Sequence, residues 1–442
     1  MKKLFSLLII VLLFTEVFGQ NIEFSPLSRY GFGELNKNRA PLSLHCGGAG
    51  VAYYNTEEFN PNNPASLGFL KLTDAEIGFH AKYKEITDKQ DNLADDWSGN
   101  ISYIHIGVPL RNTINEVLER KQYKHNYGVS LDLSPFSTTG YHYVVQDSAN
   151  DIGSTTRILD SYGGLSRFSV GFGYRYKNWG FGLAAGYIFG NVKYYQSLTF
   201  NDFTGVANNF LDDQYHASGF TGDFGVIYTR NLNQKQIDKD KSIKARSLNF
   251  GLHLTTPSTL NMSKTSLYIT RLNTSNSIVD TLLYEKDKSS KADLPLKLEA
   301  GVYYNHKQKY GWLCDLSFEN WSSSTLFEGA KGTLTNLIGI SAGGWWRPGT
   351  TGYGNLLKRS QYRYGAFYET GYLSINGEGL GRTGFTLGMA LPFSFQRQTA
   401  VINLGVEAGF IQAKDLFSEQ YVKFNIGFRL NDNEWFLKRR YN

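Results

Sequence analysis

The chain of 442 residues has little cysteine and no long apolar run after its first residues. No stretch of about eighteen apolar residues follows residue 20, so we expect no transmembrane helix. The 2 cysteines, Cys46 and Cys314, could pair in an oxidising compartment, although two unpaired side chains is the interpretation we favour. The net charge of +6 is spread without a basic stripe, which argues against a nucleic-acid partner. No linker rich in proline or serine follows Leu70, and one large unit is therefore expected.

Aromatic residues and glycine are abundant, with 30 Phe, 29 Tyr and 46 Gly. From residue 74 onward, apolar residues alternate with small or polar ones, as in the stretches 127–133, 168–176, 248–254 and 424–430. Such a period of two indicates strands with one apolar face. Without helical spans, a chain of this kind can cross a membrane only as a closed barrel, because lipid offers no partner to free backbone groups. We predict an all-β fold, a transmembrane antiparallel β-barrel.

The first nineteen residues have the layout of a secretory signal peptide. Lys2 and Lys3 precede an apolar core over 4–14, and the small residue Gly19 lies just before an expected cleavage near Gln20. We therefore set residues 1–19 apart as a signal peptide. Together with the barrel pattern, this segment predicts insertion into the outer membrane of a Gram-negative bacterium.

Fourteen strands can be assigned between residues 71 and 430, followed by a periplasmic tail over 431–442. Bacterial barrels have an even number of strands, short inner turns and longer outer loops. Short connections at 177–178, 307–308 and 396–397 fall on one side of this assignment. Longer ones at 85–97, 148–162, 198–216 and 261–292 fall on the other, and the last of these could form a hairpin outside the membrane.

Residues 20–70 lack sustained alternation and precede the barrel. Their glycines (Gly47, Gly48 and Gly50) permit tight turns and close backbone contacts. The passage that ends in Asn63, Pro64 and Ala65 is rich in turn residues. Such a segment could hang in the periplasm or fold into the lumen. Its apolar side chains favour burial, and we predict an N-terminal hatch that plugs the barrel.

The long third strand, over 122–147, contains Ser134, Pro135 and Phe136. Proline cannot donate to a strand ladder, so Pro135 indicates a bulge or break. One interpretation is a lateral gap in the barrel wall, at which the neighbouring hydroxyl groups satisfy the backbone. In the other, Pro135 lies above the membrane, where a bend costs little. The sequence leaves both open, and we take residues 134–136 as candidates for a lateral gap.

Motifs for catalysis and metal binding are weak. Gly339, Ser341 and Gly343 match the G-x-S-x-G pattern of hydrolases, but that motif needs a turn between strand and helix, and here it lies within an alternating strand. Acidic residues near 91–96 are expected to be a solvated loop and not a Ca²⁺ site. We expect no enzymatic activity, no metal and no cofactor. His253, Glu299 and Arg363 are placed on or near the lumen.

Several motifs taken in order resemble one family. The stretch GGAGVAYYN followed by Asn63, Pro64 and Ala65 is similar to the hatch of the FadL/OmpP1/TodX outer-membrane transporters. The pattern of Trp312, Asp315 and Trp321, and the segments GGLSRFSVGFGYRY and NDNEWFLKRRYN, resemble the Bacteroidetes members of that family. The resemblance implies about fourteen strands, a lumenal hatch and a kinked third strand that opens a gap toward lipid.

Two functions follow from the resemblance as expectations. The first is passive uptake of hydrophobic compounds similar to long-chain fatty acids, which would leave the barrel sideways into outer-membrane lipid. The second is a barrel that does not transport and serves as an adaptor for outer-membrane protein partners, as the PorV component of type 9 secretion does. A continuous apolar path to a gap in the wall would favour the first function.

Overall fold

The computed structural model describes residues 25–37, 40–88, 93–111, 123–149, 153–203, 205–240, 243–272, 277–327, 333–349, 355–375, 377–395, 398–413 and 417–432. The expected signal peptide, the connection expected at 396–397 and the chain beyond Asp432 lie outside these residues. No described helix is long and apolar enough to cross a membrane.

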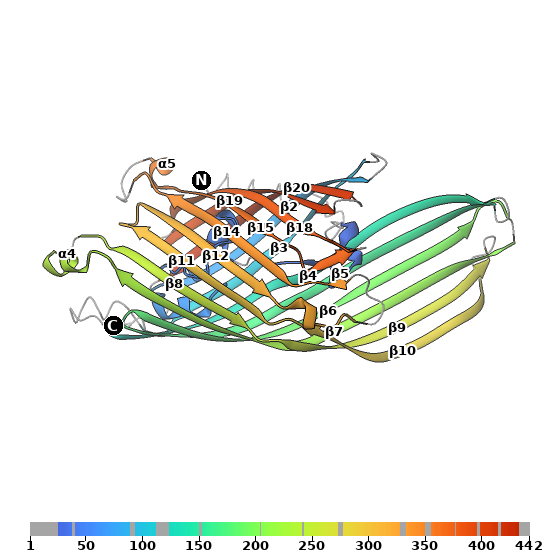
Figure 1. The fold of residues 1–442 in the computed structure, drawn as a ribbon, viewed down its shortest axis with the longest axis horizontal. Helices are drawn as coiled ribbons and strands as arrows, with labels where there is room; N and C mark the ends of the chain where they lie inside the picture. The colour runs from blue at the N-terminus through green and yellow to red at the C-terminus, as the bar shows by residue number, and fades with distance from the viewer. Residues whose placement is uncertain are drawn as a thin grey trace, which may run out of the picture.

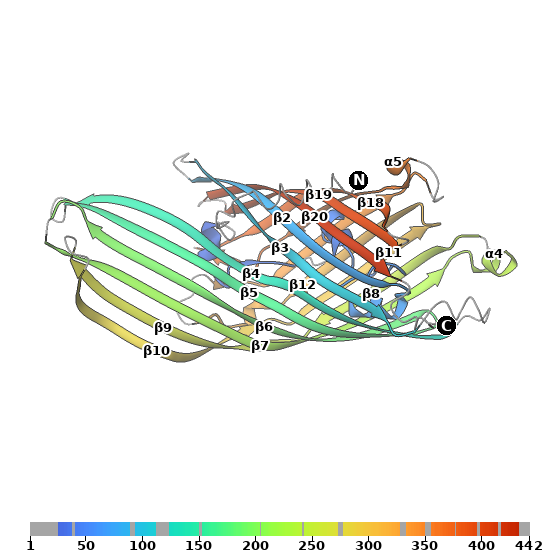
Figure 2. The same ribbon diagram turned by 180° about the vertical axis from the view of Figure 1, so that it is seen from behind.

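Fourteen antiparallel strands form a closed barrel, as the sequence predicts (Figures 1 and 2). The ring closes where β2 and β20 pair, from Thr73 with Asp432 to Asp88 with Phe417. The strands of the ring are β2 (Thr73–Asp88), β3 (Leu93–Pro109), β4 (His125–Ala149), β5 (Gly153–Tyr176), β6 (Trp179–Phe200), β7 (Ala207–Asn231), β8 (Arg246–Thr255), β11 (Lys297–His306), β12 (Tyr310–Glu319), β14 (Leu337–Trp346), β15 (Gln361–Glu369), β18 (Gly381–Phe395), β19 (Gln398–Ala413) and β20 (Phe417–Asp432).

Shorter elements lie inside and around this ring. The N-terminal residues contribute η1 (Pro26–Arg29), β1 (Glu34–Leu35), α2 (Pro41–His45) and η2 (Pro64–Phe69). A small separate sheet joins β13 (Thr333–Leu334), β16 (Leu373–Ile375) and β17 (Glu378–Gly379). The connections contain α4 (Gln234–Lys239), η3 (Trp321–Ser323) and α5 (Leu356–Arg359).

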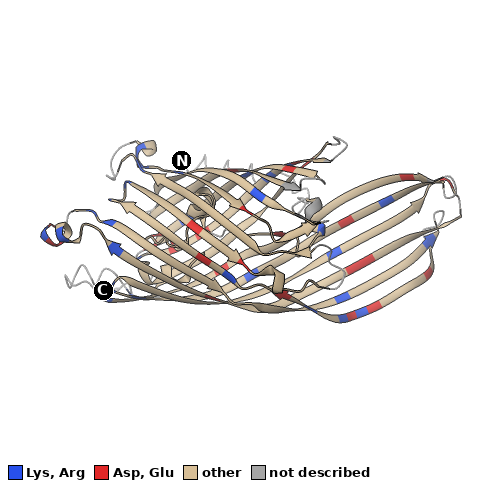
Figure 3. Cartoon of the chain, in the orientation of Figure 1, with Lys and Arg blue, Asp and Glu red and all other residues tan. Residues whose placement is uncertain are grey.

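Apolar and polar side chains separate onto the two faces of the wall. Leu131 and Phe172 are 48% and 43% exposed on the outside, whereas Ser130, Asp132 and Ser169 are buried on the inside. The alternation read from the sequence therefore gave the correct faces. Figure 3 shows charged residues in α4, along the distal parts of the long strands and at scattered positions of the barrel strands.

The long strands continue beyond the barrel as a projecting sheet (Figure 1). It combines the distal parts of β4 to β7 with a hairpin of β9 (Ser258–Leu272) and β10 (Ile278–Leu294), in which β9 pairs with β7. The hairpin expected over 261–292 is thus present. The prediction of loops at 85–97, 148–162 and 198–216 is wrong, because most of these residues belong to strands. Polar residues occur on both faces there, since neither face contacts lipid, and the period of two is lost.

An arginine at position 172 tests the outer face. Phe172→Arg places a charge on the lipid side of β5, and we expect it to lower the free energy of unfolding by about 2–4 kcal/mol at mid-membrane depth. Phe203→Arg is the control, because Phe203 is similarly exposed but lies at the end of the projecting sheet. Urea unfolding of both variants in lipid vesicles measures the difference. Equal destabilisation would show that Phe172 does not face lipid.

Candidate functional site: a lumenal cavity where strands β3 and β4 part

The N-terminal segment, which we define as the described residues between 25 and 72, lies inside the ring of strands. Leu42, Cys46, Leu67 and Leu70 are almost fully buried. Helix α2 contacts β15, β18 and β19, and η2 contacts β3 to β7 across the lumen. Helix α2 and η2 therefore fill the lumen toward the end of the barrel that carries α4, whereas η1 lies at the distal part of β4, where Ser25 donates its backbone N–H to Gly140 (Figure 1).

Glycines of the wall make room for the backbone of this segment. A Cβ added at Gly182 would lie closer than 3.0 Å to backbone atoms of Pro64 and Ala65. A Cβ at Gly365 would come equally close to the backbone of Cys46 and Gly47. The wall is thus shaped to the path of the segment, and larger residues at these positions do not fit.

The predicted glycines and the Asn-Pro-Ala motif shape the segment itself. Gly47 and Gly48 have φ of +68° and +91°, which residues with a side chain rarely adopt. Asn63 caps η2, since its Oδ1 accepts from the N–H of Ala65 at 3.0 Å. Its Nδ2 donates to the carbonyl oxygen of Val51 at 2.8 Å, which ties the two motifs together.

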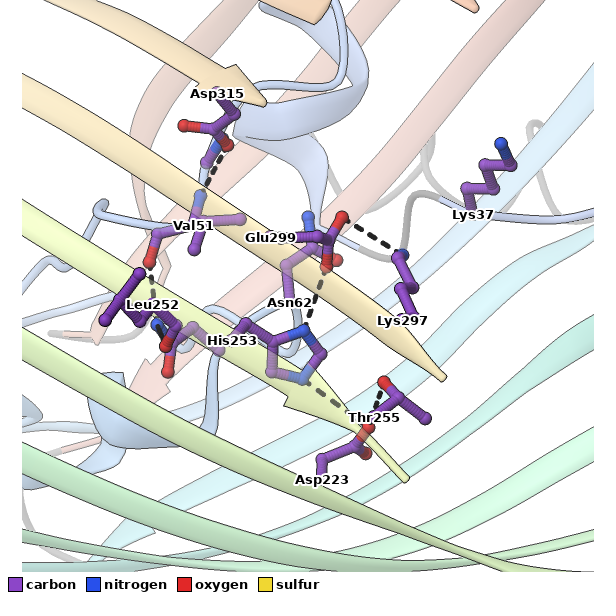
Figure 4. A network of polar contacts seen from close by, with 12 residues as sticks. Lys37, Val51, Asn62, Asp223, Leu252, His253, Thr255, Lys297, Glu299 and Asp315 are labelled. Atoms are coloured by element: carbon purple, nitrogen blue, oxygen red, sulfur yellow. Dashed lines mark hydrogen bonds and ion pairs between the residues drawn. The ribbon is translucent and has the colours of Figure 1, made fainter. Parts of the chain in front are cut away.

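Asp315 holds the turn at Gly50 from the barrel wall. Its Oδ2 accepts from the backbone N–H groups of Gly50 and Val51, at 2.6 and 2.8 Å (Figure 4). A Cβ added at Gly50 would first meet the side chain of Ser43, at 3.3 Å, and not the barrel wall. The contact of Gly50 with the wall is therefore the hydrogen bond from its backbone N–H. This gives a structural reason for the aspartate in the W-x-x-D pattern.

Removing that carboxylate is expected to loosen the segment. Asp315→Ala leaves two buried N–H groups without an acceptor, at a cost of roughly 1–3 kcal/mol each. The expected result is faster protease cleavage within residues 40–70, with the barrel still folded. Ser317→Ala, two residues along the same strand, is the control and should behave as the unchanged protein. Unchanged cleavage of Asp315→Ala would contradict the role of Asp315.

A buried ion pair also holds the segment, between Gly50 and η2. Arg429 of β20 lies 2.7 Å from Glu58, between the guanidinium and carboxylate atoms. Burial opposes ionisation of Glu58, but Arg429 and Arg363 hold the pKa of Glu58 below its ordinary value. Asn126 of β4 donates to the carbonyl oxygens of Gly68 and Leu70, at 2.9 and 3.1 Å. Side chains from distant strands therefore hold the segment in place.

Strands β3 and β4 part halfway along the wall. They pair only from Pro109 with Gly128 to Ile104 with Leu133. Beyond this point, β4 pairs with β5 on one side, with a register shift between Pro135 and Ser137. On its other side it meets β1, where Leu35 pairs with Ser137. The sequence favoured one strand with an interruption at Pro135, and β4 is such a strand. Strand β1 of the N-terminal segment covers the edge of β4 that β3 leaves open.

A cavity of about 110 Å³, partly open to solvent, lies where the two strands part. Its apolar lining includes Leu35, Pro135, Phe136, Ile188, Leu294 and Trp321. Ser134 lines it too and donates to Asp132 at 3.3 Å. The candidate residues 134–136 therefore all border one cavity. A second cavity of about 60 Å³ shares Leu35 and Lys37 with it and is mainly polar.

Charged groups border the cavity in pairs (Figure 4). His253 Nδ1 lies 2.9 Å from Glu299, and its Nε2 lies 3.5 Å from Asp223. Lys297 reaches the other oxygen of Glu299 at 3.0 Å. Arg167 forms an ion pair with Asp223, and Lys37 lies 3.1 Å from Glu369. Lys37, Arg167 and Lys297, the cations among the described residues of the lining, therefore each have a carboxylate partner.

Sequence reasoning placed His253, Glu299 and Arg363 at the lumen correctly. It missed Lys37, Arg167, Asp223, Lys297 and Trp321 as neighbours of one cavity. The alternation of the strands indicates that most of these side chains point into the lumen. It does not indicate which side chains lie next to one another. The two cysteines are free, with Cys46 buried in the segment and Cys314 exposed, which confirms the unpaired interpretation. Ser341 lies within β14.

Solved structures with the same fold include transporters and channels for aromatic hydrocarbons. The Pseudomonas putida toluene transporter TodX matches with a TM-score of 0.57 at 13% identity, over 90% of this chain and 99% of that one. The Ralstonia pickettii toluene transporter TbuX matches with 0.54 at 13% identity, again over 90% and 99%. A Pseudomonas aeruginosa FadL homologue gives 0.51 at 14% identity, over 91% and 98%. This likeness confirms the FadL-type fold that the sequence resembles.

No curated protein matches the chain in sequence. The closed barrel of fourteen strands and its FadL-type neighbours place the protein in the outer membrane. The family model BamG matches residues 1–442, the full length of the chain, and the chain therefore belongs to the BamG family.

Proposed function

We propose that the barrel is a passive route by which hydrophobic compounds cross the outer membrane and leave sideways into lipid. One observation carries the proposal: an apolar cavity borders the point where the ladder between β3 and β4 ends. A ligand would gain affinity from burial of its apolar surface, at roughly 25 cal/mol per Å². Movement of β1 away from β4 would then connect the cavity with the bilayer.

The paired charges favour a neutral ligand over a fatty acid. A carboxylate entering this cavity would have to displace Glu299 from Lys297, Asp223 from Arg167 or a carboxylate from Lys37. A hydrocarbon needs no such exchange, because the apolar lining suffices. TodX and TbuX, which share the fold, are described as toluene transporters, which supports the same class of ligand.

Filling the cavity tests this function. Ile188 is fully buried in its lining, and Ile188→Trp is expected to lower the rate of toluene uptake by cells at least tenfold. Ile338→Trp is the control, because Ile338 is exposed on the outer face of β14 and lines neither cavity, so that uptake should be unchanged. Uptake by Ile188→Trp equal to the control would refute transport through this cavity.

A second function, as the partner subunit of an outer-membrane protein machine, is favoured by the projecting sheet. Strand β10 pairs with β9, and no described strand pairs with its other edge. It exposes Ile278, Val279, Leu282 and Tyr284 outside the barrel. Unpaired edges with apolar side chains readily accept another strand. The match to the family model BamG, which is not named for transport, is compatible with this role.

Site-specific crosslinking separates the two functions. A photoreactive residue at Leu282 should yield one discrete adduct with an outer-membrane partner if β10 accepts a strand. The same residue at Lys235 of α4, at the opposite end of the molecule, is the control (Figure 1). An adduct at 282 together with normal uptake by Ile188→Trp would support the partner role over transport. Equal yields at 282 and 235 would argue against it.

A further inference from the structure

Three side chains that could bind a metal ion meet under the N-terminal segment, away from the cavity. Asp74 and Glu76 lie on β2 and His105 on β3, all three with fully buried side chains. Their ligand atoms lie within 4.8 Å of one another. His105 Nε2 is 3.9 Å from Asp74 Oδ2 and 3.8 Å from Glu76 Oε2. Ligands around Zn²⁺ at about 2.0–2.2 Å are spaced only slightly closer than this.

The surroundings hold these atoms toward one centre. Asn403 and Tyr103 both donate to Glu76 Oε1, at 2.7 and 3.0 Å, whereas Glu76 Oε2 is buried and accepts no hydrogen bond from the described residues. The His105 ring is stacked on Tyr103, with the ring centroids 5.2 Å apart. Phe59 donates its backbone N–H to Asp74 Oδ2 at 2.7 Å. Such outer contacts are what orients the ligands of metal sites.

Charge balance also favours a cation. Glu58, Asp74 and Glu76 place three carboxylates in one buried region that also holds two cations: Arg429, which lies 2.7 Å from Glu58, and Arg363, which donates to Asn403 at 3.1 Å. Isolated buried charges are costly unless they are paired or coordinate a metal. A divalent ion between Asp74 and Glu76 would supply the positive charge that the two arginines leave lacking for three carboxylates.

We propose that Asp74, Glu76 and His105 bind a divalent transition metal such as Zn²⁺. One imidazole and two carboxylates suit Zn²⁺ better than Ca²⁺ or Mg²⁺, which prefer ligand sets of oxygen alone. The ion would join β2 and β3 beneath the N-terminal segment, which contacts the same cluster through Phe59. It is a structural clamp and takes no part in ligand passage.

Metal analysis of the full-length protein without a histidine tag tests this site. After expression with added zinc and purification in mild detergent, we expect one zinc per chain, and less than a tenth of that in Glu76→Gln and His105→Asn. His80→Asn is the control, because His80 is also buried in the lumen and contacts Ser102 at 2.9 Å. Heat-modified gel mobility verifies that each barrel is folded.

X-ray absorption at the zinc edge gives a second measurement that needs no variant. The expected spectrum shows nitrogen and oxygen ligands including one imidazole, and chelation should lower the unfolding temperature of the unchanged protein but not that of Glu76→Gln. Absence of stoichiometric zinc in the unchanged protein would overturn the proposal. So would zinc content in folded His105→Asn equal to that of His80→Asn.

Discussion

A disulfide between positions 35 and 137 is expected to stop uptake of a hydrophobic compound, and its reduction to restore uptake. Leu35 of β1 pairs with Ser137 of β4 beside the cavity. Paired residues of antiparallel strands have Cα atoms about 4.5–5.5 Å apart, which suits a disulfide. The crosslink in Leu35→Cys with Ser137→Cys would hold the N-terminal segment against the edge of β4. In the proposed route, ligand leaves only when that contact opens.

The matched crosslink is Asp213→Cys with Ser266→Cys. These residues pair between β7 and β9 in the projecting sheet, which the proposed route does not cross. Both variants carry Cys314→Ser, so that the exposed native thiol cannot compete. Toluene uptake is measured before and after reduction. Full uptake with the 35–137 crosslink formed would refute lateral exit at this position and favour the partner role.

The substitutions Gly182→Ala and Gly365→Ala are expected to displace the N-terminal segment from its position in the lumen. The added Cβ meets backbone atoms of the segment in both cases, and backbone cannot rotate away as a side chain can. Overpacking of this kind typically costs 1–3 kcal/mol, and about twice that when both sites are changed. We expect larger single-channel conductance and greater sensitivity of cells to bulky antibiotics.

Gly222→Ala is the control for this experiment. Gly222 lies on β7, where the first atoms that a Cβ would meet belong to the side chain of Thr256 at 3.3 Å and beyond. This substitution should leave conductance at its original value. If Gly182→Ala and Gly365→Ala conduct no more than Gly222→Ala, the segment does not close the pore.

The barrel was predictable because membrane strands repeat one simple pattern. Lipid on one side of β5 requires apolar residues such as Phe172, and the filled lumen on the other requires small ones such as Gly171. The distal part of the same strand has solvent around it, so polar residues occupy both faces and the sequence suggested a loop. The backbone of the distal part stays extended because the neighbouring strands supply its hydrogen bonds. These hydrogen bonds cannot be inferred from the pattern of side chains.

The contacts of the site could not be read from the sequence. Pro135 was recognisable because proline lacks an N–H in any context. Glu58 and Arg429, in contrast, become partners only when the barrel closes and brings β20 next to the N-terminal segment. The pairing of Arg167 with Asp223 likewise depends on the register of β5, β6 and β7. A polar residue at an inward position indicates the lumen, and its partner follows only from the three-dimensional arrangement.

The most direct test of the account is the location of a bound hydrophobic compound. Crystals of the protein soaked with bromobenzene would reveal bromine by its anomalous scattering. The account predicts a peak inside the cavity, between Phe136, Ile188 and Trp321, that is lost in Ile188→Trp. Bromine found only on the outer, lipid-facing surface of the barrel, with the cavity free of ligand, would contradict it.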